Sequence, residues 1–307
     1  MRTWSRRSFQ SGLAASIATS RLFAARPKRK QHPDLRGKMG IVSASLSPHI
    51  SDKPNENQIR LLDLPAVLKD DLGLEILDFN TANFPSLEPD YIEKLRAAVE
   101  KSGCTATNLK LNQKVDMNSP DTETRAQAMA VYKKSIDAAK LLGCRWVRPL
   151  PRAETPDRVR HIDAFNDLID YAGERGITVL IENFGWMMKD ENSVVKLAGE
   201  IGADRISVGL DTGNWENNEI RYPALEKTFP LAVTCDFKAR ELTPNGADFD
   251  HSAYDLERCF QIGWDAGFRG PWAFEHGHKD FATAKQHLIW MREQVETWTK
   301  RAIQTAN

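Results

Sequence analysis

The chain has 307 residues, and its 42 basic and 42 acidic residues give a formal net charge of zero. This length fits one barrel of roughly 250 residues with an extension better than a single sandwich or bundle. Residues 1–33 carry eight Lys or Arg and no acid, which leaves 34 basic and 42 acidic residues and a net charge of −8, so the body lacks the basic stripe that a nucleic-acid partner requires.

The first segment is typical of a targeting signal. The stretch "SRRSFQSGLAASIATS" places Arg6 and Arg7 before a weakly apolar run of small residues. It resembles a twin-arginine export signal with a cleavage site near Ala18 to Ser20, which predicts an exported or periplasmic protein. Because the segment is also rich in Arg and Ser, a mitochondrial transit peptide and a plain basic arm on a cytoplasmic protein stay open. We exclude residues 1–33 from the fold.

Short apolar runs recur along the remaining chain, each followed by a polar stretch and a helical pattern. There are eight runs, at 39–47, 74–80, 105–111, 145–150, 177–184, 206–213, 232–239 and 271–277. None approaches the ~20 apolar residues that a membrane span requires, so we expect no membrane partner. Four cysteines, Cys104, Cys144, Cys235 and Cys259, lack C-x-x-C spacing and are expected to be buried thiols.

Helix signals lie between the runs. Residues 122–142 carry one apolar stripe that Gly143 ends, and Thr155 before Pro156 predicts the start of another helix, which Gly176 closes. Strands that alternate with helices imply a parallel sheet, and eight such units predict a closed (β/α)8 TIM barrel, a single α/β domain over residues 34–307. The chain has no G-x-G-x-x-G turn, which disfavours a dinucleotide-binding sheet.

Four acidic residues fall at the ends of successive runs: Glu182, Asp211, Asp236 and Glu275. In a parallel barrel these strand ends face one mouth, so the four carboxylates are expected to converge there. Each could be paired with Arg or Lys. Clustered carboxylates otherwise need a compensating cation, and an all-oxygen set favours a hard or borderline divalent ion such as Mg²⁺ or Mn²⁺.

The motifs at these strand ends resemble a known family. "IEN" at Glu182, "LDTGN" at Asp211, Lys238 two residues after Asp236, and "FE" at Glu275 are similar to the xylose isomerase-like TIM-barrel superfamily of sugar isomerases and epimerases. The resemblance implies that Glu182, Asp211 and Glu275 occupy three of the four metal-ligand positions. Asp236 stands where most sugar epimerases have a histidine.

The resemblance also implies roles in catalysis. One divalent ion, Mn²⁺ or Mg²⁺, would be the cofactor, and Glu182 and Glu275 would form the acid/base pair that moves a proton through an enediolate. Lys238 shares a strand face with Asp236, so it could stabilise the developing oxyanion or simply neutralise the acidic rim. Asn214 stands where many members have a substrate-contacting histidine, and an amide there still permits a hydrogen bond to a sugar hydroxyl.

Further polar and aromatic residues near the mouth are candidates for substrate binding. They are Arg148, Asn183, Trp186, Trp215, His49 and His278. Arg148 could instead pair with a ligand carboxylate, Asn183 is expected to face away from Glu182, and the two tryptophans could pack in the core rather than stack on a sugar ring.

The sequence therefore predicts a metal-dependent isomerase or epimerase of a small sugar, ketose or polyol. A dehydratase acting on an inosose or a dehydroshikimate, and a barrel that only binds sugars, stay as alternatives. An endonuclease of the same superfamily is disfavoured because its three-zinc cluster needs several histidines, and the second and third runs have none. A homo-oligomer is left open.

Overall fold

The computed structural model describes residues 32–151 and 153–305. The targeting signal expected over residues 1–33 lies outside these residues except for His32 and Pro33, so it stays a prediction. None of the described helices is both long and apolar enough to span a membrane.

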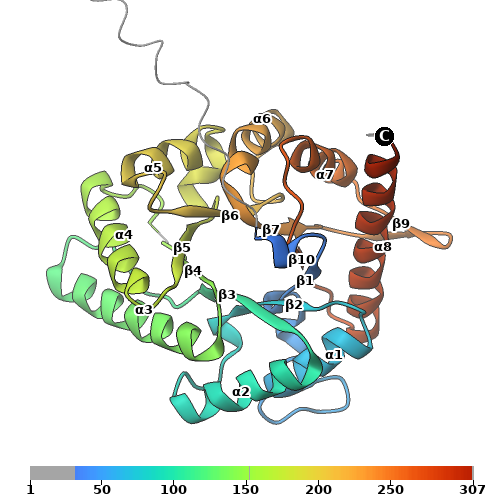
Figure 1. Ribbon diagram of the computed structural model, residues 1–307, viewed down its shortest axis with the longest axis horizontal. Helices are drawn as coiled ribbons and strands as arrows, with labels where there is room; N and C mark the ends of the chain where they lie inside the picture. The colour runs from blue at the N-terminus through green and yellow to red at the C-terminus, as the bar shows by residue number, and fades with distance from the viewer. Residues whose placement is uncertain (1–31, 152, 306–307) are drawn as a thin grey trace, which may run out of the picture.

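Within the described residues, eight parallel strands close into one barrel (Figure 1). In chain order they are β1 (Met39–Val42), β2 (Ile76–Asn80), β3 (Thr105–Leu111), β4 (Trp146–Pro149), β5 (Thr178–Ile181), β6 (Ser207–Asp211), β7 (Ala232–Lys238) and β10 (Trp272–Glu275). Neighbours around the barrel follow the order β1-β10-β7-β6-β5-β4-β3-β2, so strands β3 and β7 lie on opposite walls. The predicted barrel is confirmed.

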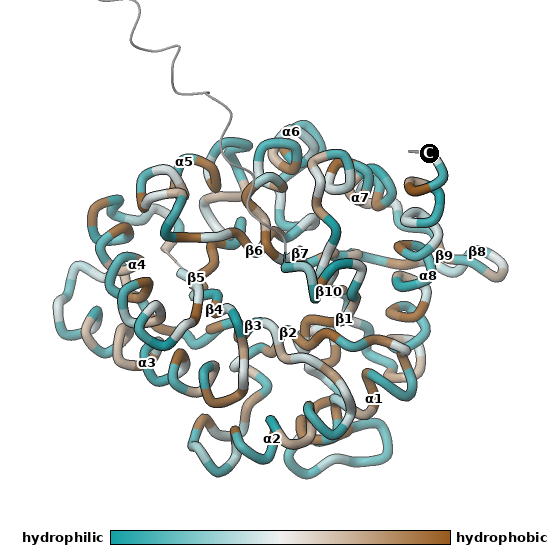
Figure 2. The backbone as a smooth tube through the Cα atoms, in the orientation of Figure 1, coloured by the Kyte–Doolittle hydropathy of each residue, from teal (hydrophilic) through white to brown (hydrophobic). Residues whose placement is uncertain are grey.

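Helices form the outer ring around the strands (Figure 1). They are α1 (Leu64–Asp70), α2 (Pro89–Ser102), α3 (Thr122–Leu142), α4 (Arg158–Gly173), α5 (Ser193–Ile201), α6 (Asn218–Thr228), α7 (Leu256–Asp265) and α8 (Phe281–Thr305). Short 3-10 helices lie at η1 (Pro33–Leu35), η2 (Ser43–His49), η3 (Leu61–Asp63), η4 (Thr81–Asn83), η5 (Gly185–Lys189) and η6 (Phe229–Leu231). Figure 2 shows apolar and polar residues interleaved along the outer helices, as expected of helices with one buried face.

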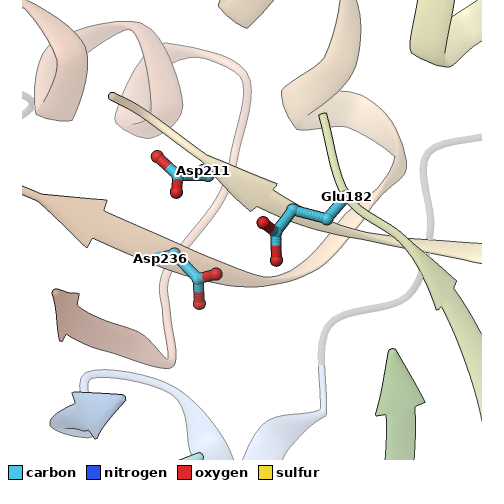
Figure 3. Close-up of side chains that lie close together, drawn as sticks. All are labelled: Glu182, Asp211 and Asp236. Carbon is cyan, nitrogen blue, oxygen red and sulfur yellow. The ribbon is translucent and has the colours of Figure 1, made fainter. Parts of the chain in front are cut away.

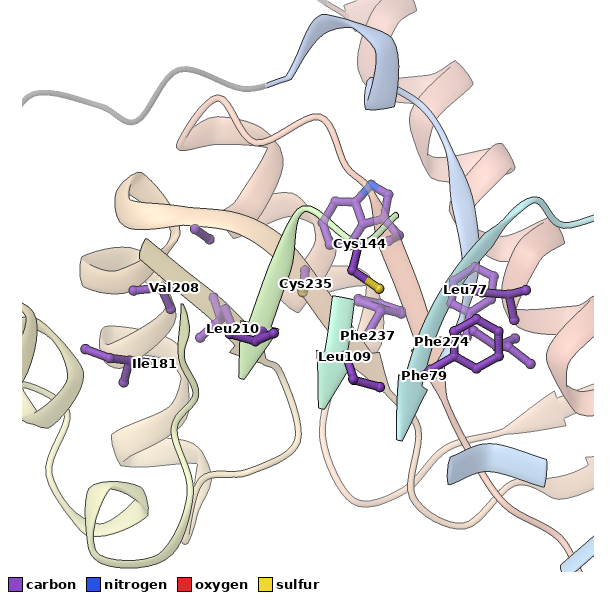
Figure 4. Packing of buried hydrophobic residues seen from close by; sticks show 14 of the residues in the cluster. Leu77, Phe79, Leu109, Cys144, Ile181, Val208, Leu210, Cys235, Phe237 and Phe274 are labelled. Carbon is purple, nitrogen blue, oxygen red and sulfur yellow. The ribbon is translucent and has the colours of Figure 1, made fainter. Parts of the chain in front are cut away.

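The main core lies between the barrel and the helices. Because side chains alternate along a strand, one set on each strand points outward into this core and the other set points into the lumen. Leu109, Leu210 and Phe237 belong to the outward set and are fully buried (Figure 4). Their chain neighbours therefore face the lumen. The four cysteines are buried free thiols, as predicted.

The expected helix boundaries are correct at one helix and wrong at another. Helix α3 spans Thr122–Leu142 and ends at Gly143, which adopts the left-handed conformation with φ of 89°. Helix α4 begins at Arg158, and its N-cap is Asp157 rather than Thr155, because the Asp157 side chain accepts the Arg160 N–H at 3.0 Å. This helix ends at Gly173, three residues before the predicted Gly176.

One element was not expected from the sequence. Strands β8 (Thr243–Asn245) and β9 (Asp248–Asp250) form an antiparallel hairpin between β7 and α7. The signal is an Asn-Gly pair at Asn245 and Gly246, and Gly246 has φ of 65°. The alternation of strands and helices that predicts the barrel does not predict an inserted hairpin.

His161 on α4 makes the fold sensitive to acid. Its ring is fully buried beside Phe165, neither ring nitrogen has a hydrogen-bond partner in the described chain, and burial lowers its pKa to about 4. Between this value and the ordinary 6.5, the unfolded chain binds more protons than the folded one, so stability is lost as the pH falls through that window.

Between these pKa values the free energy of unfolding of the wild type should fall by at most about 1.4 kcal/mol for each unit by which the pH falls. We expect His161→Phe to remove this dependence, because phenylalanine fills the same space and cannot be protonated. Urea unfolding of both proteins across this pH range measures the difference. Above the ordinary histidine pKa the two curves should run parallel. Parallel curves throughout the acidic range as well would show that His161 does not titrate with folding.

Candidate active site

The four predicted carboxylates lie at the carboxyl ends of β5, β6, β7 and β10. Glu182 follows β5 directly, and Asp211 ends β6. Asp236 on β7 is the register partner of Asp211 on the neighbouring strand. Figure 3 shows that these three side chains reach into the same space, and one oxygen of each lies within 4.8 Å of the others. Glu275 ends β10 beside Lys238. The expected convergence of carboxylates is therefore seen for Glu182, Asp211 and Asp236, whereas Glu275 lies outside this group of three.

The loop after β6 fixes Asp211. Its Oδ1 accepts the Gly213 N–H at 2.6 Å and the Asn214 N–H at 3.0 Å. A side chain at Gly213 could not fit, because a Cβ there would lie 2.6 Å from the Tyr254 hydroxyl and 2.7 Å from Cδ of Lys238. The glycine of "LDTGN" therefore lets the backbone pack closely under the site while its N–H holds the carboxylate.

Asn183 faces away from Glu182, as the alternation of the strand predicts. Its Nδ2 donates to the carbonyl oxygens of Asp211 at 2.8 Å and Asn214 at 2.9 Å, and its Oδ1 accepts the Asp211 N–H at 2.9 Å. The side chain is fully buried. Asn183 thus ties the end of β5 to the loop after β6 and sets the position of Asp211.

Lys110 on β3 is a site residue that the motifs at the strand ends do not predict. It is buried, with 2% of its surface exposed, although it carries an ammonium group. Its side chain crosses the lumen, and Nζ donates to Glu182 Oε2 at 3.2 Å and to Asp236 on the opposite wall. The signal was present in "TNLKL", because Leu109 and Leu111 are outward core residues and Lys110 between them must face the lumen.

Two further cations, Lys238 and Arg148, contact the same acids. We call the four carboxylates and the side chains that contact them the carboxylate cluster. Nζ of Lys238 donates to Asp211 Oδ2 at 3.3 Å, to Asn214 Oδ1 at 3.2 Å and to Glu275. Arg148 on β4 forms an ion pair with Glu182, with 2.8 Å between Nε and Oε2. Each of the four predicted carboxylates is therefore in contact with a lysine or an arginine.

The balance of charges explains the pKa values at the site. Burial alone would raise the pKa of Glu182, but Arg148 and Lys110 outweigh burial and lower it to about 2. Burial raises the pKa of Asp211 to about 6 against the opposing charge of Lys238, and burial also raises the pKa of Asp236. Among the described residues four acids meet three bases in this cluster, so one negative charge is left in excess, and the raised pKa values fall on the two most deeply buried acids, Asp211 and Asp236.

The lysines show the opposite balance. Burial disfavours the charged form of Lys110, but the attraction of Asp236 and Glu182 outweighs it and raises the pKa of Lys110. The pKa of Lys238 is likewise raised, because Asp211 and Glu275 outweigh burial. Both ammonium groups are therefore charged at neutral pH.

The carboxylate oxygens of the site have the chemistry that a divalent ion requires. Glu182, Asp211 and Asp236 offer converging carboxylate oxygens, and Asp236 Oδ1 is buried with no hydrogen-bond partner among the described residues. Such an orphaned anionic oxygen is costly to bury unless a cation contacts it. Oxygens of the same three carboxylates contact Lys110 and Lys238, so an ion would compete with these ammonium groups.

A cavity of about 660 Å³ opens beside this cluster. Among the four carboxylates it borders Glu275 alone, together with Lys238. The remaining lining comes mainly from the segment after β7 and from the loop after β10, with Arg240, Glu241, His276, His278, Lys279 and His287 as its charged and titratable residues. Of the predicted binding residues outside the cluster, His278 lies at this cavity.

Three predicted binding residues lie elsewhere. Trp215 is buried in the main core, and Trp186 packs edge-on against His161. His49 is buried, stacks on Phe281 and has Nε2 at 2.9 Å from the His278 carbonyl oxygen. None of the three borders the cavity as the described residues line it. By contrast, Asn214 and Arg148 lie in the carboxylate cluster, where Asn214 Nδ2 donates to Glu182 at 3.3 Å.

The protein is thus a (β/α)8 barrel that carries a cluster of carboxylates, paired with lysines and an arginine, at the carboxyl-terminal mouth of its strands. The sequence profile of the family described as xylose isomerase-like TIM barrel matches residues 70–294. The chain belongs to this family.

Solved structures share the fold over nearly the whole barrel. A xylose isomerase domain protein from Planctomyces limnophilus has a TM-score of 0.67 and 17% identity, over 88% of this chain and 99% of its own. An L-ribulose 3-epimerase has a TM-score of 0.67 and 15% identity, over 88% and 97%. A xylose isomerase-like TIM barrel protein from Mycobacterium smegmatis in complex with magnesium has a TM-score of 0.62 and 16% identity, over 89% and 99%. No curated protein sequence matches the chain.

Proposed function

We propose that the protein is a sugar isomerase or epimerase that moves a proton between carbon and carboxylate and depends on one divalent ion, Mn²⁺ or Mg²⁺. The observation that carries this proposal is the position of Glu275, which borders the cavity while Glu182, Asp211 and Asp236 form an acidic triad beside it. The family, the epimerase activity named for one structural neighbour and the magnesium bound to another support it.

Glu275 is the proposed proton acceptor. Its side chain is 23% exposed, whereas that of Glu182 is 5% exposed and is held by Arg148 and Lys110. A carboxylate whose pKa is lowered to about 2 is a weak base, so Glu182 is the poorer acceptor while these cations contact it. Glu182 remains the candidate for the opposite face of the substrate.

Lys238 and Asn214 are the proposed orienting groups. Lys238 contacts Glu275 and also borders the cavity, so its ammonium can hold the proton acceptor and attract a developing oxyanion on the substrate. Asn214 can hydrogen-bond a sugar hydroxyl but cannot transfer a proton. When bound by the triad, the divalent ion would polarise the substrate's carbonyl and so acidify the adjacent C–H bond.

A sugar-binding barrel without catalysis is the second candidate. The observation that favours it is that every predicted carboxylate already contacts a cationic side chain, so most of the negative charge is neutralised by the protein itself. The dehydratase alternative uses the same acidified C–H bond and differs in the group that leaves.

One exchange experiment separates the three functions. The purified protein is loaded in turn with Mn²⁺ and Mg²⁺ and incubated in D₂O with a panel of ketoses and inososes, followed by NMR. We expect deuterium at the carbon next to the carbonyl, together with an isomerised or inverted sugar. Loss of water from the substrate would identify a dehydratase instead. The absence of exchange with every sugar and both ions would reject the enzymatic function.

We also propose where the enzyme acts and what size of substrate it takes. The twin-arginine-like segment supports export, which would place the enzyme where it meets sugars outside the cytoplasm. The substrate is a small sugar, since the cavity is of a size that holds small ligands.

A further inference from the structure

We propose that Lys110 is a built-in cation that competes with the divalent ion for Glu182 and Asp236, so that metal binds only in exchange for the contacts of this lysine. The inference rests on the proposed metal site but not on the proposed reaction. It assigns a role to a buried lysine that the proposed proton transfer does not use.

The geometry places Lys110 between two of the three triad residues. Its Nζ contacts Glu182 and Asp236, whose oxygens also belong to the group that converges within 4.8 Å. Any ion that bridges these two carboxylates from inside the lumen needs the space that the ammonium fills. Two cations in contact with the same pair of oxygens would also repel each other strongly in a buried setting.

The neighbouring cations do not hold the same position. Lys238 contacts Asp211 and Glu275 from the cavity side, and its side chain is 16% exposed, so it can move toward solvent. Arg148 contacts the same oxygen of Glu182 as Lys110 does, Oε2, and is held by a hydrogen bond from Nη1 to Asn112 Oδ1 at 2.7 Å. Lys110 is the cation that contacts Asp236, and the free oxygen of Asp236 shows that one ammonium does not satisfy this carboxylate.

The removal of the Lys110 charge should therefore strengthen metal binding. The test is calorimetric titration of the metal-free full chain with MnCl₂ at one fixed pH, for the wild type, Lys110→Gln and Lys110→Met. We expect both variants to bind Mn²⁺ at least about tenfold more tightly than the wild type, at one ion per chain, because a repelling charge has left the site. Lys133→Met, which removes a partly exposed lysine on α3 that is paired with Asp167 at 2.8 Å, should change the affinity less than twofold.

Thermal melting gives a second measurement if Lys110→Met does not fold without metal. Lys110→Gln keeps an amide donor for Asp236, and a saturating concentration of Mn²⁺ should raise its Tm more than that of the wild type. Equal or weaker Mn²⁺ binding by a folded Lys110 variant, or no binding by any of the proteins, would overturn the proposal. Tighter Mn²⁺ binding by the variants without any sugar exchange would reject the enzymatic function alone, and sugar exchange by the wild type without tighter binding in the variants would reject this proposal alone.

Discussion

Glu275→Gln is expected to lower kcat/KM for proton exchange by about 10²- to 10⁴-fold, the range typical for loss of a positioned acid or base. The amide has the size of the carboxylate and retains an oxygen that can accept the Lys238 hydrogen bond, but it cannot take up a proton. Deuterium incorporation into the ketose on which the wild type acts, followed by NMR, measures the loss.

The fold should tolerate this change. The Glu275 side chain is 23% exposed, and Lys238 keeps its contact with Asp211 at 3.3 Å, so we expect the free energy of unfolding to change by less than about 1 kcal/mol. Glu93→Gln is the control for the same chemical change, because Glu93 is exposed on α2 and lies outside both the cavity and the carboxylate cluster, and it should retain most of the activity. Retention of activity in Glu275→Gln would exclude Glu275 as the proton acceptor.

Lys110→Met should have the largest effect on stability in the absence of metal. It leaves Asp236 fully buried without its cation, and breaking a buried ion pair by removing one partner costs about 3–5 kcal/mol. Methionine fills much of the same volume, so the loss reports the charge rather than a cavity. Urea unfolding of the metal-free proteins measures it, and Lys133→Met at the partly exposed pair should cost no more than about 1 kcal/mol.

A double-mutant cycle with Asp236→Asn tests whether the two groups act as a pair. The combination of Lys110→Met with Asp236→Asn removes both charges, so it should cost less than the sum of the single changes. Additive losses would mean that Lys110 and Asp236 do not stabilise the barrel as a pair, and the cation-exchange proposal would then lose its electrostatic basis.

Several features of the site were predictable because they depend on local pattern. Glu182, Asp211 and Glu275 were expected at one mouth because each follows an apolar strand, and parallel strands in a barrel end at the same side. The alternation of the strand also predicted that Asn183 would face away from Glu182. The same rule applied to "TNLKL" would have placed Lys110 in the lumen, but no local feature connects β3 with acids more than seventy residues later.

The sequence by itself determined the eight strand-and-helix units, the closed barrel and the set of acids at its mouth, because periodicity and chain order fix which residues face the lumen and at which end. Only the tertiary structure decided which cations neutralise the negative charges of those acids. Lys110 and Asp236 meet because β3 and β7 lie on opposite walls of a closed barrel, and their contact depends on side-chain length across the lumen. The charge balance of a buried site depends on residues from several strands that are distant in sequence. It is therefore set when the barrel closes and not by any one motif.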